Sequence, residues 1–112
     1  PDIVGMVGLF AYNAPAIVSA LKDAGKLGKI KIVAFDEQDE TLQAIKDGHV
    51  AGTVVQQPYE FGYQSVKMMS ALLKGEKPEI PENKQIIVPT KVIKQTDVDT
   101  FWAELKKLTG KS

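Results

Sequence analysis

Three short apolar runs constrain the fold of this chain more than any other feature of its sequence. Each run is rich in β-branched or aromatic residues, and each stops at a polar side chain. Such runs are typical of strands that are buried on both faces of a parallel sheet. The runs are Ile3–Ala11 before Tyr12 and Asn13, Lys29–Phe35 before Asp36, and Ala51–Val55 before Gln56.

Segments with helical spacing separate these runs. After the first run, apolar residues recur at spacings of three and four, which predicts a helix that Asn13 caps and Pro15 opens. We expect further helices from about Asp39 to Asp47 and from about Tyr59 to Lys74. The alternation predicts right-handed βαβ units, and therefore an α/β fold with a Rossmann-like parallel sheet and flanking helices.

The last third of the chain has a different composition. Two Pro residues after the third helix indicate an extended connector, and two short apolar runs, Gln85–Val88 and Lys91–Ile93, predict strands. Thr96 is expected to cap a last helix, from Asp97 to about Leu108. We therefore predict a βαβαβ core over residues 1–57, a crossover helix and connector over residues 58–84, and returning strands with a C-terminal helix over residues 85–112.

Composition excludes several classes of function. The 112 residues carry 14 basic and 14 acidic side chains, so we expect no nucleic-acid partner. There is no Cys and only one His, His49, which lies in a turn; we expect no metal site and no cofactor. No apolar run approaches the roughly 20 residues needed to span a bilayer. The chain begins at Pro1 rather than Met, from which we expect that an upstream segment was removed.

Polar side chains at the ends of the three runs form the candidate site. The carboxyl ends of parallel strands meet at one edge of the sheet, where open α/β sheets hold their ligands. Asn13, Asp36 and Gln56 would lie there, and none of them is a nucleophile. Amides and a carboxylate suit an uncharged polyhydroxylated ligand, whose hydroxyl groups both donate and accept hydrogen bonds. Tyr12 is a further candidate, as a ring that covers the apolar side of such a ligand.

Each candidate also has a purely structural interpretation. Asn13 can serve only as a helix cap, and Asp36 or Gln56 can be an ordinary turn residue. Tyr12 can be a packing residue. The acidic run after Asp36 is consistent with helix capping, because it lacks the Gly and the alternating spacing of a calcium loop.

These segments resemble the type I periplasmic sugar-binding proteins, in particular the ribose- and glucose/xylose-binding group that serves ABC importers. The resemblance covers nearly all of the chain. It is carried by Phe10–Asn13, which resembles a segment ending in a ligand-binding Asn; by Ile32–Asp36, which resembles the strand V-x-F-D; and by Ile45–Pro58, which resembles I-x-x-G-x-x-x-A-T-x-x-Q-x-P.

The resemblance implies a two-lobed protein that closes on a monosaccharide by a hinge motion and delivers it to a membrane permease without making or breaking a bond. Asn13, Asp36 and Gln56 match the positions that bind sugar hydroxyls, and Pro58 lies where one hinge strand crosses. It also implies an exported protein whose signal is not in this chain. Relatives often carry a small residue where Glu37 stands, so the sugar is left open.

The chain resembles only part of that architecture: most of the C-terminal lobe and one crossover helix of the other lobe. We therefore expect the apolar face of the helix from Tyr59 to Lys74 to be covered in one of three ways: by the missing N-terminal portion, present as another chain, by self-association, or by refolding of the helix onto the chain's own sheet.

Two other classes of function fit parts of the pattern. The effector domain of a LacI-type regulator resembles this fold, but it would require an upstream helix-turn-helix. A phosphate-handling enzyme could use Asp36 as its nucleophile. The second Asp of the required Asp-x-Asp motif is displaced here by one residue, to Asp39.

Overall fold

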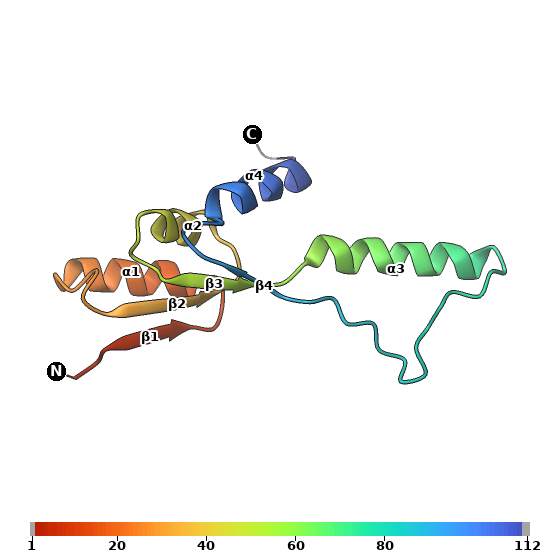
Figure 1. Cartoon of the computed structure of the whole chain (residues 1–112), viewed down its shortest axis with the longest axis horizontal. Helices are drawn as coiled ribbons and strands as arrows, with labels where there is room; N and C mark the ends of the chain where they lie inside the picture. Colours follow the sequence, from red (N-terminus) through yellow and green to blue (C-terminus); the bar gives the residue numbers. More distant parts are fainter. Residues whose placement is uncertain (1, 111–112) are drawn as a thin grey trace. The chain divides into compact units, whose positions relative to one another are not determined.

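The computed structural model describes residues 2–110, and the chain divides into two compact units (Figure 1). The first, called the sheet unit, contains the residues up to Val55 and from Lys91 onward. The second, called the helical unit, contains Gln56–Thr90. Each unit is described by itself.

Within the described residues, the sheet unit contains one four-stranded sheet. Its strands are β1 (Gly5–Gly8), β2 (Lys31–Phe35), β3 (Gly52–Val55) and β4 (Lys91–Ile93), and they lie side by side in that order. The first three strands run parallel, with Met6 opposite Ile32 and Ala34 opposite Thr53. The α/β prediction is therefore confirmed. β4 differs from the expected parallel pattern, because it pairs antiparallel to β3 at the edge of the sheet.

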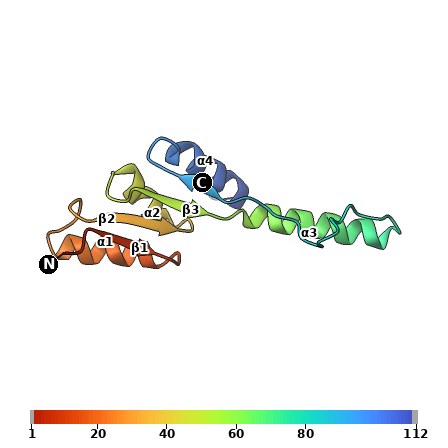
Figure 2. The same ribbon diagram turned by 60° about the horizontal axis from the view of Figure 1, so that its bottom comes forward.

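Three helices cover one face of this sheet. They are α1 (Asn13–Asp23), α2 (Asp39–Lys46) and α4 (Val98–Thr109). The crossovers from β1 to β2 and from β2 to β3 step in the same direction, so the right-handed rule places α1 and α2 on the same face. Figures 1 and 2 show α2 between α1 and α4. The core lies between this layer and the sheet. Its fully buried larger apolar side chains are Ile32, Leu42, Ile45, Val50, Val55 and Val98.

The opposite face of the sheet carries exposed valines. Val7 and Val33 are paired across β1 and β2 and are 59% and 40% exposed, and Val92 on β4 is 60% exposed. Parallel sheets normally have both faces covered. No helix of the sheet unit, within residues 2–110, covers this one.

The helical unit contains α3 (Pro58–Leu73), followed by an irregular connector. Pro58 opens the helix, where its missing N–H is not needed. All residues of α3 are described, and none of them is buried. Val66, Met69 and Leu73 are exposed along one face of the helix. The Gln57 side-chain amide donates a hydrogen bond to the Pro89 carbonyl at 2.8 Å and so joins the two ends of the unit.

The prediction of a strand over Gln85–Val88 is wrong. The segment is irregular, and Ile86 and Ile87 are 46% and 82% exposed. A short apolar run forms a strand only when a neighbouring strand pairs with its backbone hydrogen-bonding groups, and Pro89 also lacks a backbone donor.

Two predicted caps are also corrected. Tyr12 is the N-cap of α1, without a side-chain cap bond, and Asn13 is the first helical residue. The N-cap of α4 is Asp97 rather than Thr96. The Thr96 hydroxyl donates to the Asp97 carboxylate at 3.0 Å, and that carboxylate accepts the Lys94 backbone N–H at 3.2 Å. Asp97 therefore occupies the N-cap position, but its carboxylate bonds to the segment before α4 and makes no cap bond to the helix.

Candidate functional site

The candidate residues follow the carboxyl ends of adjacent parallel strands. Asp36 comes directly after β2, and Asn13 begins α1 after the short turn that leaves β1. The fold of the sheet unit thus brings Asn13 and Asp36 to the same edge of its sheet. Gln56 directly follows β3 in the chain and is exposed, but it belongs to the helical unit. Its participation in one site with the other two remains a prediction.

Asn13 is held in place by a tight turn. Its Oδ1 atom accepts a hydrogen bond from the Phe10 backbone N–H at 2.9 Å, and its own backbone N–H donates to the Phe10 carbonyl at 2.9 Å. The carbonyl side of the amide is therefore engaged locally. The two donors on Nδ2 make no hydrogen bond within the described residues, which leaves them free for a ligand.

Gly8, the last residue of β1, permits this arrangement. A Cβ atom at position 8 would lie 2.9 Å from the Cβ of Asn13 and 3.1 Å from the backbone nitrogen of Ala14. Both distances are shorter than normal contacts, so the start of α1 packs against β1 only because residue 8 has no side chain. The sequence shows only that a Gly lies five residues before Asn13. Gly is too common for this spacing alone to predict the close contact between β1 and α1.

Asp36 has an unusual backbone conformation for a residue with a side chain. Its φ angle is 65°, in the left-handed region. Its backbone N–H donates to the Val54 carbonyl at 2.9 Å, and its carbonyl accepts the Thr53 hydroxyl at 2.7 Å. Asp36 is thereby anchored to β3 through both of its backbone polar groups.

The Asp36 carboxylate does not cap the following helix. The N-cap of α2 is Gln38, which makes no side-chain cap bond. None of the hydrogen bonds found among residues 2–110 involves the Asp36 carboxylate. A partly buried carboxylate with unused acceptors is suited to bind a donor from outside the chain.

Glu37 places a second carboxyl group beside Asp36. Burial raises the pKa of the Glu37 carboxyl above its usual value, because burial disfavours the charged form, and repulsion from Asp36 raises it further. A backbone hydrogen bond opposes this shift. Burial and the nearby Asp36 carboxylate therefore both favour the neutral form of Glu37.

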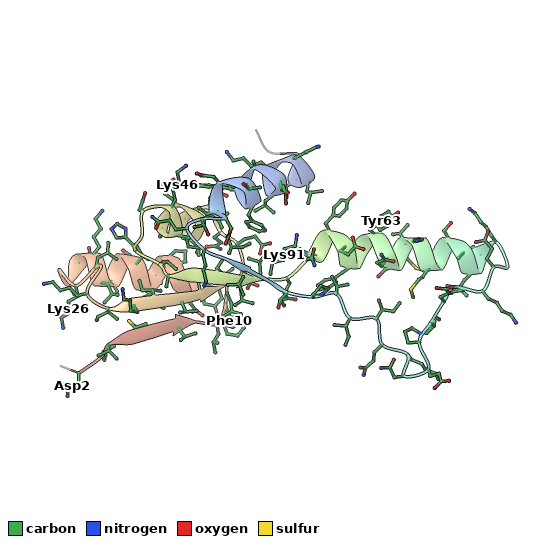
Figure 3. The ribbon with its side chains drawn as sticks, in the orientation of Figure 1. Asp2, Phe10, Lys26, Lys46, Tyr63 and Lys91 are labelled. Carbon is green, nitrogen blue, oxygen red and sulfur yellow. The ribbon has the colours of Figure 1, made fainter. Side chains whose placement is uncertain are left out.

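Two aromatic rings lie beside Asn13. Tyr12 and Phe10 stack with their ring centroids 5.8 Å apart and their planes at 10°, and they are 65% and 57% exposed. Figure 3 shows Phe10 at the carboxyl end of β1. Tyr12 was a sequence candidate, whereas Phe10 was not. The spacing of Phe10 and Tyr12 was a signal that the sequence contained. Side chains two residues apart in extended backbone point to the same side, so the two rings could have been expected to lie near each other.

The described residues show little else that could support other chemistry. Residues 2–110 contain no group of three or more His, Cys, Asp or Glu side chains arranged to hold a metal ion. His49 is partly buried in the turn after α2. In the same part of the chain, no helix combines the length and the apolar character required to cross a membrane.

Comparison with known proteins finds similar sequences and folds. The family described as "Periplasmic binding protein domain" matches residues 1–77. The ribose import binding protein RbsB of Haemophilus influenzae is 39% identical over 84 residues, which cover 70% of this chain and 28% of that protein.

Solved structures of sugar-binding proteins superpose on most of the chain. A solute-binding protein of an ABC transporter from Agrobacterium vitis, with bound D-fucose, is 32% identical with a TM-score of 0.76, covering 92% of this chain and 34% of that one. A carbohydrate transporter solute-binding protein from Agrobacterium radiobacter, in complex with D-arabinose, is 30% identical with a TM-score of 0.74, covering 94% and 34%.

The chain thus spans between about a quarter and a third of the length of these relatives. The family match covers more than half of the chain, and the fold and sequence similarities agree with it. The chain belongs to the periplasmic binding protein family, within its type I sugar-binding group.

Proposed function

We propose that this chain is part of an extracytoplasmic solute-binding protein that captures a monosaccharide and delivers it to the permease of an ABC importer. The observation that carries this proposal is the Asp36 carboxylate, which follows the carboxyl end of β2 and makes no hydrogen bond within residues 2–110. The names of the relatives supply the ligand class, because they describe binding of ribose, D-fucose and D-arabinose.

Each candidate residue has a distinct role in this proposal. Asp36 accepts hydrogen bonds from sugar hydroxyls, and the free Nδ2 donors of Asn13 bond to sugar oxygens. Gln56 supplies a second amide. Tyr12, stacked on Phe10, offers an exposed ring surface for the apolar C–H side of the sugar. None of these groups is an activated nucleophile, so the protein acts by binding and release and is not an enzyme.

The rest of the protein completes the site in this proposal. The chain covers only part of its relatives' length, and the valine face of the sheet and the exposed face of α3 lack a covering layer among the described residues. We propose that a further portion of the protein covers them, as a preceding segment or another chain, and that Pro58 lies at a hinge. The transport relatives favour this function over a LacI-type regulator, for which an upstream helix-turn-helix would be decisive.

Titration calorimetry of the protein with D-ribose, D-arabinose and D-fucose tests the proposal. Asp36→Ala removes a charged acceptor whose hydrogen bonds are each worth about 1.5–3 kcal/mol, so two lost bonds predict at least about 100-fold weaker binding. Asp23→Ala, at the exposed C-terminal end of α1, is the matched control and should leave the affinity unchanged. Absence of heat with all three sugars, or equal affinity of the Asp36→Ala variant and the unmodified protein, would contradict the assignment.

A further inference from the structure

Thr53 is a polar residue in the most buried part of the sheet. It lies in the middle of β3, is fully buried, and is opposite Ala34 on β2 and Ile93 on β4. Val has nearly the same shape and would suit a buried strand as well or better. Burial of the hydroxyl group costs free energy unless a hydrogen-bond partner compensates for the lost contact with water.

That partner is the backbone of Asp36. The Thr53 hydroxyl donates to the Asp36 carbonyl at 2.7 Å, between residues that are 17 positions apart in the sequence. The carbonyl belongs to the residue at which the chain leaves β2 with a φ angle of 65°. Left-handed backbone is unfavourable for residues with a Cβ atom and persists where the surroundings stabilise it.

A second buried Thr shows that burial alone does not explain this bond. Thr41 in α2 is 1% exposed, and its hydroxyl has no hydrogen-bond partner among the described residues. The two residues have the same side chain and similar burial, but only Thr53 contacts the backbone of a candidate ligand-binding residue.

We propose that Thr53 is a positioning residue for ligand binding: its hydroxyl holds Asp36 in the left-handed conformation that presents the carboxylate at the edge of the sheet. The inference rests on the proposed function, because it assigns Thr53 a role in the same site. The Asp36 N–H bond to Val54 continues the ladder between β2 and β3, whereas the Thr53 bond acts where the ladder stops. Loss of the Thr53 bond removes one of the two backbone hydrogen bonds that hold Asp36, so the residue can leave φ of 65°, and a change in φ moves the carboxylate.

Three variants separate this role from a merely structural one. Thr53→Val removes the donor while keeping the shape, Thr53→Ser keeps the donor, and Thr41→Val is the matched control at a hydroxyl without a partner. The first readout needs no sugar: the Cα and Cβ chemical shifts of Asp36 report its backbone conformation, and hydrogen exchange of its amide reports the bond to Val54.

In Thr53→Val we expect the left-handed shifts of Asp36 to be lost and its amide to exchange at least about tenfold faster. We expect both properties to return in Thr53→Ser and to be unchanged in Thr41→Val. Unchanged shifts and exchange in a folded Thr53→Val variant would overturn the proposal. If Thr53→Val does not fold, Thr53→Cys, with a weak donor of similar size, takes its place with the same expected direction.

The second readout is calorimetry with D-ribose. Thr53→Val should weaken binding about tenfold, and Thr53→Ser should restore it. A change in the Asp36 signals with unaltered affinity for ribose would overturn the role in binding. Failure of the unmodified protein to bind any sugar would instead count against the proposed function, and the chemical shifts would still decide whether Thr53 sets the conformation of Asp36.

Discussion

Substitution of Gly8 by Ala tests the contact that positions the start of α1 beside the candidate site. The added Cβ would lie 2.9 Å from the Asn13 Cβ and 3.1 Å from the Ala14 nitrogen. Neither atom is the end of a flexible side chain, so the first turn of α1 must move by a few tenths of an ångström. Gly5 on the same strand is the control, since its added Cβ would meet only the Lys31 carbonyl, at an ordinary 3.6 Å.

The expected magnitude follows from two opposing effects. Overpacking a close contact costs about 1–3 kcal/mol, and replacing Gly by Ala returns about 0.4–1 kcal/mol by restricting the unfolded chain. We therefore expect Gly8→Ala to lose about 1–2 kcal/mol of unfolding free energy. Gly5→Ala meets no such contact and should be neutral or slightly stabilising.

Urea unfolding followed by circular dichroism measures this difference. With the denaturant dependence usual for small domains, the midpoint for Gly8→Ala should fall by about 0.5–1 M relative to the unmodified chain. The same variant should bind ribose more weakly, because Asn13 is displaced with the helix. Equal midpoints for Gly8→Ala and Gly5→Ala would refute the reasoning that residue 8 must lack a side chain.

Two further substitutions test the pH dependence and the sheet. The pKa of Glu37 is raised in the folded protein, so its contribution to stability is present at acidic pH and is lost as the pH rises through the folded pKa. Glu37→Gln should therefore raise the melting temperature at neutral pH and not at acidic pH; an equal rise at both would show that ionisation is not the cause. Gly52→Ala would place a Cβ 2.8 Å from the Ile93 carbonyl and should cost about 1–3 kcal/mol in urea unfolding. A urea midpoint equal to that of the unmodified chain would mean that β3 and β4 can move apart at this position without loss of stability.

Most secondary structure was predictable because it depends on local patterns. The periodicity of the apolar residues located the helices α1 to α4 and the strands β1 to β4 to within a few residues, and alternation of strands with helices predicted the α/β class. The strand predicted over Gln85–Val88 failed for the opposite reason. An apolar run becomes a strand only if another strand pairs with it, and local sequence contains no information about that partner.

For the candidate site, the identity of the residues could be predicted from the sequence, whereas their conformation and contacts could not. Asn13, Asp36 and Gln56 could be selected from the sequence, because the pattern of an apolar run followed by a polar residue can be recognised without a structure. The left-handed conformation of Asp36, its bond from Thr53 and the close approach of Asn13 to Gly8 could not be, since each depends on contact between different strands and helices.

The sequence by itself determined which segments become strands and helices and which polar groups follow the strands, because these properties depend on neighbouring residues. Only the tertiary structure decided the direction of β4, the coverage of one sheet face and the free state of the Asp36 carboxylate. The physical reason is that hydrogen bonds and packing between distant segments are established only when the chain folds, and many sequences with the same local pattern would form different ones.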